Sequence, residues 1–576
     1  FAATIRQYGP DSVAFYVSGQ LLTEDYYVFN KLAKGLIGTN NIDTNSRLCM
    51  SSAVAGYKLT LGADAPPCGY ADIGQAGMIF IAGANPAVAH PIIFRAIEDA
   101  KAANPALKIV VADPRRSESA EMADLHLPIR PGSDIALFNG MLHVLIRDGL
   151  VDRAYIDRHT RGFDELAGIV AHYTPPAVAE ICGVPASDIE QAARWFGQSG
   201  PALSLYCQGL NQSAHGTHNN AALIHLHLAT GQIGKPGAGP FSLTGQPNAM
   251  GGREVGGMAN LLSAHRDLGN PQHRAEVAAL WGVPSVPEKP GKSAVELFEA
   301  LKSGKIRAVW IACTNPAHSL PHQSAVRAAL QAADYVVVQE AFAHTDTAAY
   351  ADLLLPASAW GEKHGTVSNS ERRISHVRGA VAPPGEARHD WQIVVDFAHR
   401  LGRRLGVDGE RLFPYADPES IFNEHRESTR GRDLDITGLS YAVLDQAGPQ
   451  QWPYPTGAAG GKIRLYEDGV FPTPDGKARF VTVDHAPTAE QPDAATPISL
   501  LSGRLRDHWH GMSRTGTVPR LFNLDDEPQL AMHPCDMRHR GLRSGDLVRV
   551  GNARGELAVR VIERPGLKKG RAWMPM

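Results

Sequence analysis

The sequence predicts an α/β fold built from duplicated, doubly wound parallel-sheet units, with a β-barrel-like domain at its C-terminal end. A strand–turn–helix–strand pattern occurs twice, and its apolar runs are uninterrupted, as in parallel strands that are buried on both faces. From about Thr496 the pattern changes to short β-runs separated by turn signals, which is typical of a small barrel. The length of 576 residues fits several domains, because single cores rarely exceed about 250–300 residues.

The duplication is most visible in two strand–turn segments, MIFIAGANPAVAHP and AVWIACTNPAHSLPH. Their NPA triplets begin at Asn85 and Asn315, an offset of 230 residues. The strand endings that follow, ADLHLP and ADLLLP, begin at Ala123 and Ala351, an offset of 228 residues. The nearly constant offset indicates an internal repeat.

Polar turn residues follow the predicted strands in both copies. The first copy places Asn85, Asp113 and Arg115 there, and the second places Asn315 and Gln339. Doubly wound sheets bind their ligands just beyond the carboxyl ends of the strands, so we expect two related crevices that bind related ligands, nucleotides in particular. The alternative is a duplicated domain whose turns only reverse the chain, because Asn-Pro is a common turn starter.

Composition limits the classes of protein. The net charge of −3 argues against a nucleic-acid-binding platform, and we find no signal peptide and no apolar run near the roughly 20 residues that span a bilayer. The six cysteines contain no CxxC pair, which argues against a local iron–sulfur motif or a disulfide framework and fits a reducing, cytoplasmic location. The chain begins at Phe1 without an initiator methionine, so we expect a fragment of a longer polypeptide.

Three polar clusters are open to two interpretations. Asp134, in RPGSD, follows a Pro-Gly turn, where it either accepts hydrogen bonds from a purine edge or is simply solvated. The run GRLRDHWHGMSRTG contains His508 and Arg514 and fits a phosphate-binding strand end or a solvent-facing hairpin. A surface loop explains the run GEKHGTVSNSERRI (residues 361–374) almost as well as a functional cluster does.

One cysteine, Cys49, lies between a polar turn and a helix-like apolar run, in NIDTNSRLCMSSAVAGYKLTLG. No other cysteine is near it in the sequence. Taken by itself it fits a core residue, because cysteine outside disulfides is among the most buried residue types.

Nine segments, read in order, resemble the molybdopterin oxidoreductases of the dimethyl sulfoxide reductase superfamily over essentially the whole chain, and most closely the catalytic subunits of bacterial assimilatory nitrate reductases. The segments are TNSRLCMSSAVAGYKLTLGADAPPCGYADI, GANPAVAHP, DPRR, RPGSDIAL, CQGLNQSAHGT, GQIGKPGAGPFSLTGQPNAMGGREVGG, CTNPAHSLP, LPASAWGEKHGTVSNSERRI and RDHWHGMSRTG. The resemblance implies a molybdenum held by the dithiolenes of two molybdopterin guanine dinucleotides, with one copy of the duplicated unit for each nucleotide arm.

The resemblance also implies roles for individual residues. Cys49 supplies the thiolate ligand of molybdenum, which suits a soft metal. Met50 follows it where formate dehydrogenases of this family have histidine, which favours nitrate as the substrate, and Arg253 guides the anion to the metal. The implied cofactor-binding residues are Asn85, Asp113, Arg115, Asp134, Gly209, Gln212, Asn315, Gln339, His508 and Arg514.

By the same resemblance, residues 1–48 and 250–480 form a first, discontinuous α/β dinucleotide-binding domain. Residues 49–249 form a second one, which carries the metal-ligand cysteine, and residues 496–576 form a β-barrel domain that caps the cofactor. Members of this type usually begin with a cysteine-rich segment that holds a four-iron, four-sulfur (4Fe–4S) cluster. The present sequence shows no such segment, so we expect the cluster in the full-length protein and not on this chain.

The implied activity is the reduction of nitrate to nitrite by oxygen-atom transfer, in nitrate assimilation. The electron donor is a ferredoxin, a flavodoxin or an NADH-linked reductase subunit, and the sequence leaves the donor, the oligomeric state and the choice between molybdenum and tungsten open. The alternatives are a formate dehydrogenase or another molybdopterin oxidoreductase, and a non-catalytic relative that is a structural subunit of an electron-transfer complex. We expect neither nucleic acid nor a membrane as a partner.

Overall fold

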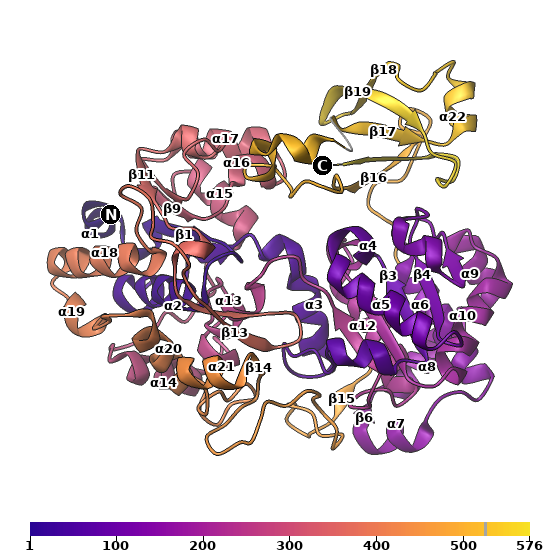
Figure 1. Ribbon diagram of the computed structural model, residues 1–576, viewed down its shortest axis with the longest axis horizontal. Helices are drawn as coiled ribbons and strands as arrows, with labels where there is room; N and C mark the ends of the chain where they lie inside the picture. The colour runs from indigo at the N-terminus through magenta and orange to yellow at the C-terminus, as the bar shows by residue number, and fades with distance from the viewer. Residues whose placement is uncertain (524–526, 576) are drawn as a thin grey trace. The chain divides into compact units, whose positions relative to one another are not determined.

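The computed structural model describes residues 1–523 and 527–575, which form two compact units (Figure 1). The first unit joins Phe1–Cys49 to Gln246–Ile463, and the second joins Met50–Gly245 to Arg464–Met576. Each unit contains one five-stranded sheet in which all strands are parallel. The three-domain division expected from the resemblance stays a prediction.

The sheet of the first unit has the strand order β11-β10-β9-β1-β2. Its strands are β1 (Val13–Val17), β2 (Ile42–Thr44), β9 (Ala308–Ala312), β10 (Tyr335–Glu340) and β11 (Leu353–Pro356), and its main helices are α2 (Thr23–Lys31), α15 (Ala294–Lys302), α17 (Gln323–Ala332) and α18 (Asp390–Leu405). Neighbouring side chains of β1 point to opposite layers: Phe15 packs with α2 and α18, and Tyr16 packs with α15 and α17. A strand between two apolar layers requires an apolar residue at every position, which is why the run VAFYV does not alternate.

The sheet of the second unit has the equivalent order β5-β4-β3-β7-β8. Its strands are β3 (Met78–Ala82), β4 (Lys108–Ala112), β5 (Leu125–Leu127), β7 (Ala202–Tyr206) and β8 (Gly239–Ser242), and its main helices are α5 (Pro91–Ala103), α6 (Asp134–Arg147), α10 (Ala186–Gln198) and α12 (Gly216–Ala229). Phe80 contacts Phe138 of α6 and Phe196 of α10, whereas its neighbour Ile79 belongs to a different layer with Ile97 of α5. Both faces of this sheet are therefore buried as well.

The two NPA turns make the same hydrogen bonds. Asn85 Oδ1 accepts hydrogen bonds from the Ser119 backbone N–H (3.2 Å) and from its hydroxyl (2.7 Å). Asn315 Oδ1 accepts the equivalent bonds from Thr347 N–H (3.0 Å) and from its hydroxyl (2.7 Å). Each asparagine thus ties the turn after one strand to the turn after the next strand. The predicted duplication of a parallel α/β unit is confirmed.

The duplication extends further than the sequence comparison indicated. The pair β1–β2 occupies the same positions in the first sheet as the pair β7–β8 does in the second. The NPA segments cover only the other three strands of each sheet. The pair lies N-terminal to its NPA turn in the first unit and C-terminal to it in the second, so a search at one constant offset does not detect this half of the repeat.

The C-terminal part of the chain forms a mixed, five-stranded sheet in the order β16-β20-β17-β19-β18, as predicted for a β domain. Its strands are β16 (Ser499–Gly503), β17 (Gln529–Met532), β18 (Leu547–Asn552), β19 (Gly555–Glu563) and β20 (Arg571–Pro575). Its small core contains Leu530, Met532, Val561 and Ala572. Among the helices of residues 1–523 and 527–575, none has the length and hydrophobicity that a membrane crossing requires.

Candidate active site

The segments of Cys49 and Arg253 occupy equivalent places in the duplicated fold. The chain passes from the first unit to the second after Cys49, within α3 (Arg47–Thr60), and this crossing follows the edge strand β2. It returns to the first unit at Gln246, just before α13 (Ala249–Glu254), and this crossing follows the edge strand β8. The predicted metal ligand therefore lies just beyond the carboxyl end of the edge strand β2, where doubly wound sheets bind ligands. The predicted anion-guiding residue lies on the first helix of the segment that follows β8 in the chain.

Cys49 lies on the first turn of α3 and is half-buried. Its backbone N–H donates a hydrogen bond to the Ser46 carbonyl (3.1 Å). The turn that leads to it is held by Asn45, whose side-chain oxygen accepts hydrogen bonds from Gly19 N–H (3.1 Å) and Gln246 Nε2 (3.0 Å). The positive end of a helix favours a thiolate over a thiol, so this position suits a thiolate ligand. Met50, the next residue, is buried.

Arg253 lies on α13 and is only 4% exposed. Its guanidinium donates a hydrogen bond to the Ala249 carbonyl (3.0 Å) and another to the Met250 sulfur (3.4 Å). The glycines before it allow α13 to pack closely, because a Cβ atom on Gly252 would lie 2.6 Å from the ring of Tyr26. Burial raises the pKa of Tyr26 and the positive charge of Arg253 opposes that shift, so the phenol and the guanidinium interact electrostatically.

In the second unit, two strand ends meet through a pair of glycines. The Gly209 N–H donates a hydrogen bond to the Gly83 carbonyl (2.8 Å), and a Cβ atom on Gly209 would collide with the Gly83 backbone. Gly83 has φ 55°, which is the left-handed region that favours glycine. The pair joins the turn after β3 to the turn after β7. Gly209, one of the expected cofactor-binding residues, therefore lies at the carboxyl edge of this sheet.

Two carboxylates lie at the same edge: Asp113, which is half-buried, and Asp134, which is buried. Burial raises the pKa of Asp113 to about 6. A hydrogen bond from the Arg115 N–H (2.8 Å) and the positive charge of Arg115 act in the opposite direction and lower it. Burial also raises the pKa of Asp134 to about 7, and the negative charge of Asp113 adds to this rise. The alternative of a solvated turn aspartate at Asp134 is wrong. Buried carboxylates with raised pKa values are typical of binding sites.

The C-terminal sheet contributes residues to this edge that the sequence did not indicate. Arg571 of β20 donates hydrogen bonds to the carbonyls of Pro114 (2.9 Å) and Pro128 (3.3 Å), and its positive charge lowers the pKa of Asp113. The guanidinium of Arg115 lies over the ring of Trp573, 5.0 Å from its centroid. Nothing in the segment GRAWMPM distinguishes these residues from an ordinary β-run, since their role depends on contacts with residues more than 400 positions away.

The run GRLRDHWHGMSRTG is divided between the interior and the surface. Arg504 donates a hydrogen bond to the Val88 carbonyl (3.0 Å) and lies over the ring of Trp509 (5.3 Å). His508 is buried against Phe522, whereas Arg514 is exposed. The alternative of a wholly solvent-facing hairpin is therefore wrong for His508.

Several buried nitrogen atoms of the second unit have no hydrogen-bond partner within the described residues. They include His90 Nδ1, Asn211 Nδ2, Arg504 Nε and His508 Nε2, besides the Nδ1 atoms of His225, His227 and His485. Arg504 interacts electrostatically with both His90 and Cys207, so part of this set is clustered around the ends of β3 and β7. Buried polar groups are rarely left without partners in folded proteins. Nitrogen atoms that can donate hydrogen bonds, at the strand ends that the Gly83–Gly209 contact joins, suit an anionic ligand such as a cofactor that carries phosphate groups.

All the expected cofactor contacts stay predictions, and the side chains of Asn85, Asn315 and Gln339 already have hydrogen-bond partners within the protein. The Asn85 amide nitrogen donates to Glu118 (2.7 Å) and the Asn315 amide nitrogen donates to Asp346 (3.1 Å), so both side chains already bridge two turns. Gln339 is fully buried and donates to Asp390 Oδ1 (2.6 Å). Gln212 is exposed at the end of the short helix α11 (Gln208–Asn211).

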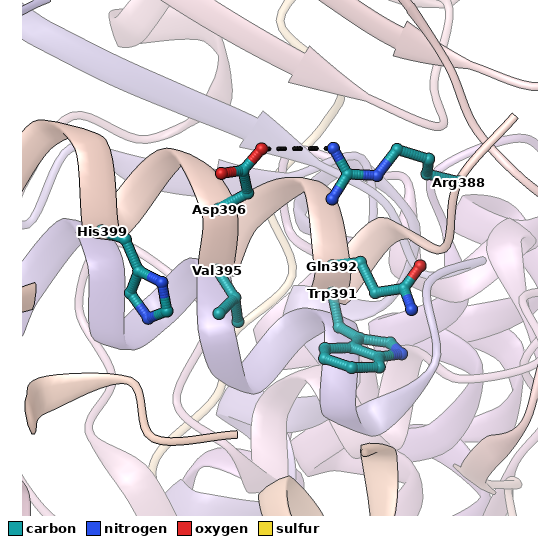
Figure 2. A pocket seen from close by; sticks show the side chains of 6 residues that line it. All are labelled: Arg388, Trp391, Gln392, Val395, Asp396 and His399. Carbon is teal, nitrogen blue, oxygen red and sulfur yellow. Dashed lines mark hydrogen bonds and ion pairs between the residues drawn. The ribbon is translucent and has the colours of Figure 1, made fainter. Parts of the chain in front are cut away.

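A surface hollow of about 480 Å³ lies along α18 in the first unit (Figure 2). Its lining residues are Arg388, Trp391, Gln392, Val395, Asp396 and His399. Arg388 and Asp396 form an ion pair across its rim (3.2 Å). None of the predicted site residues lines this hollow, so it is separate from the candidate site. No group of three or more His, Cys, Asp or Glu side chains in the described part of the chain is arranged to hold a metal ion.

The raised pKa of Asp134 gives a testable pH dependence. A carboxyl group with a pKa of about 7 in the folded protein and about 3.9 in the unfolded chain destabilises the fold increasingly as the pH rises from about 4 to about 7. We therefore expect Asp134→Asn to raise the free energy of unfolding at pH 8 by on the order of 1–3 kcal/mol and to leave it nearly unchanged at pH 4. Urea unfolding at the two pH values measures this. The exposed Asp164, changed to Asn, is the control, and an equal effect of Asp134→Asn at both pH values would contradict the assignment.

Comparison with known proteins agrees with these observations. The family model for molybdopterin oxidoreductases matches residues 1–400, and the model for the molydopterin dinucleotide binding domain matches residues 498–576. A nitrate reductase of Synechocystis sp. is 44% identical over 574 residues, which cover 99% of this chain and 80% of that protein. A nitrate reductase of Klebsiella oxytoca is 43% identical over 580 residues, which cover 99% of this chain and 65% of that protein.

A solved structure has a similar fold. The acetylene hydratase from Pelobacter acetylenicus matches with a TM-score of 0.76 over 99% of this chain and 80% of that chain. Its sequence is 22% identical, so the likeness shows the fold alone.

Proposed function

The chain belongs to the molybdopterin oxidoreductase family, and from this premise we propose that it is the catalytic part of a nitrate reductase. The observation that carries the proposal is its identity of 43–44% to nitrate reductases across nearly its whole length. The pair Cys49-Met50 supports the same substrate, because the formate dehydrogenases that it resembles have histidine after the ligand position. The reaction is the reduction of nitrate to nitrite and water with two electrons and two protons.

We assign the residues of this chain to binding and orientation. The cofactor, molybdenum with two molybdopterin guanine dinucleotides, supplies the redox centre at which the oxygen atom is transferred. Cys49 holds the metal, and the strand-end residues of each unit bind one nucleotide arm. Arg253 is a buried cation. A cation that is already in place when nitrate arrives offsets the free energy of removing the anion from water, because the protein need not rearrange around it.

Electrons require a further route. We propose a 4Fe–4S cluster in the full-length protein and a ferredoxin, a flavodoxin or an NADH-linked reductase subunit as the donor, in the cytoplasm. We propose that the protein acts in nitrate assimilation. Metal analysis of the full-length protein would distinguish molybdenum from tungsten.

The full-length protein tests the proposal. We expect the purified enzyme to contain molybdenum and to oxidise a reduced viologen dye with nitrate but not to reduce the dye with formate. Formate oxidation without nitrate reduction would identify a formate dehydrogenase. A folded protein without metal and without either activity would identify a structural relative.

A further inference from the structure

Glu254, the residue after Arg253, is a buried carboxylate that makes no ion pair among the described residues. It is only 1% exposed, and burial raises its pKa. Each oxygen instead accepts a hydrogen bond from a neutral donor: Oε2 from the Ser368 hydroxyl (2.7 Å) and Oε1 from Trp452 Nε1 (2.6 Å). The positive charges of His265 and Arg253 oppose the rise in its pKa. Burying a carboxylate that accepts hydrogen bonds only from neutral donors costs folding free energy, so its presence here calls for an explanation.

The two donors connect α13 to distant segments of the first unit. Ser368 ends β12 (Gly365–Ser368), and Trp452 follows β14 (Gln450–Gln451). At the other end of α13, the Asn248 side-chain oxygen accepts a hydrogen bond from Ser368 N–H (2.7 Å), and its amide nitrogen donates to the Leu21 carbonyl (2.9 Å). Hydrogen bonds to Ser368, at the end of β12, therefore hold both the N-cap residue Asn248 and the last residue Glu254 of the helix that carries Arg253.

A second buried charge holds the chain just after α13. Lys34 donates hydrogen bonds from Nζ to the carbonyls of Gly256 (2.7 Å), Met258 (2.9 Å) and Leu261 (2.5 Å). Burial lowers its pKa to about 7. Because the backbone is held on both sides of residues 249–255, the remaining freedom of Arg253 is mainly that of its own side chain.

We propose that Glu254 is a positioning residue for the substrate: it holds α13 so that Arg253 presents its guanidinium to the nitrate anion. This inference rests on the proposed function. Two effects of Glu254 on nitrate binding have opposite signs. Its negative charge alone repels the anion, so removing the charge would strengthen binding. Its hydrogen bonds hold Arg253 in place, so removing them weakens binding. The structure favours the second effect, because both oxygens are occupied by donors that fix the backbone.

The direction in which Glu254→Gln changes nitrate binding distinguishes the two effects. A glutamine keeps the size but is neutral and presents one acceptor and one donor group, so the two charge-assisted bonds from Ser368 and Trp452 become weaker neutral ones, and the Ser368 hydroxyl must turn from donor to acceptor. We expect KM for nitrate, and the nitrate dissociation constant of the oxidised holoenzyme by titration calorimetry, to rise by about tenfold, with kcat changed by less than about threefold. We expect Ser368→Ala and Trp452→Phe each to raise KM by a smaller factor.

Glu24→Gln is the matched control. Glu24 is a fully buried carboxylate of the same unit that accepts hydrogen bonds from Thr366 (2.8 and 2.9 Å) and from the Tyr441 hydroxyl (2.8 Å). Its substitution should lower the unfolding temperature without changing KM. An unchanged or lowered KM in Glu254→Gln would overturn the inference, and so would an equal rise in the control.

A double-variant cycle tests whether Glu254 acts through Arg253. In an Arg253→Ala background, Glu254→Gln should change the nitrate dissociation constant by less than about twofold, because the group that it positions is gone. A tenfold change in that background would show an independent role. If the unaltered full-length enzyme does not reduce or bind nitrate, the proposed function fails, whereas normal nitrate reduction with an unresponsive Glu254→Gln variant refutes only this inference.

Discussion

Replacing Cys49 by alanine in the full-length protein should abolish nitrate reduction and leave the protein folded. In the function proposed above this thiolate is the protein's ligand to the metal, so the expected loss of kcat is at least about 1,000-fold, or roughly 4 kcal/mol of activation free energy. The fold should tolerate the change, because Cys49 is half-buried on the first turn of α3 and alanine is the best helix former. Oxidation of a reduced viologen dye by nitrate measures the activity, and thermal unfolding measures the fold.

Cys535→Ala is the control for this substitution. Cys535 is also half-buried and on the first turn of a helix, α22 (Pro534–His539), but it belongs to the small C-terminal sheet domain. Its replacement should leave the activity within about twofold of the unaltered enzyme. Full activity in Cys49→Ala would refute the assignment of the metal ligand, and a loss of the folded state would be visible in the unfolding curve.

Replacing Lys363 by methionine should lower the free energy of unfolding by about 3–5 kcal/mol, the range for breaking a buried ion pair. The Lys363 ammonium lies 3.0 Å from Asp25 Oδ2 and also forms an ion pair with Asp390, and both carboxylates are fully buried. Asp25 accepts backbone hydrogen bonds from Leu22 and Trp391 (3.0 Å each). The triad therefore joins α2 to α18, and removing the ammonium leaves two buried carboxylates without a counter-charge.

The pH dependence of this effect identifies its cause. Burial raises the pKa of Asp25 to about 6, and the charge of Lys363 limits that rise. Without Lys363 the carboxylates should protonate at a higher pH than in the unaltered protein. The stability lost in Lys363→Met should therefore be greatest near pH 8 and decrease as the pH falls towards 5. Urea unfolding at both values measures this difference.

An exposed ion pair is the matched control for Lys363. Arg403 and Glu410 lie 2.9 Å apart with side chains that are 60% and 70% exposed. Arg403→Met should change the free energy of unfolding by less than about 1 kcal/mol, because solvent screens such a pair. A pH-independent loss in Lys363→Met, or a loss as small as that of Arg403→Met, would show that the triad is not a buried charge network.

The run GEKHGTVSNSERRI illustrates why composition could not settle its role. Its members Lys363, Thr366, Glu371 and Arg372 are all buried, so the interpretation as a surface loop is wrong for them. Charged residues are rarely buried unless they are paired, and some of the partners here lie far away in the sequence. Lys363 is paired with Asp25, more than 300 residues earlier, and Arg372 donates to the Ile463 carbonyl (2.7 Å), about 90 residues later.

The same limit applies to the candidate site. The role expected for Asp113 rested on its position after a predicted strand, and that of Asp134 on its position after a Pro-Gly turn. The structure places both at the carboxyl edge of one sheet. The interaction of Asp113 with Arg571 was not predictable, because a β-run in the C-terminal segment contains no signal for the turn that it covers. Likewise, nothing local indicated that Glu254 is tied to Ser368 and Trp452.

Local patterns were enough to predict the parallel α/β class, the duplicated NPA units, the C-terminal β domain and the family. Each of these follows from local patterns: uninterrupted apolar runs, turn residues after strands, and motifs in a fixed order. Local patterns do not show which polar groups are buried or what each one contacts, and the folded structure is needed for both. The reason is physical, since the cost of burying a charge and the hydrogen bonds that offset it depend on residues brought together from distant parts of the chain.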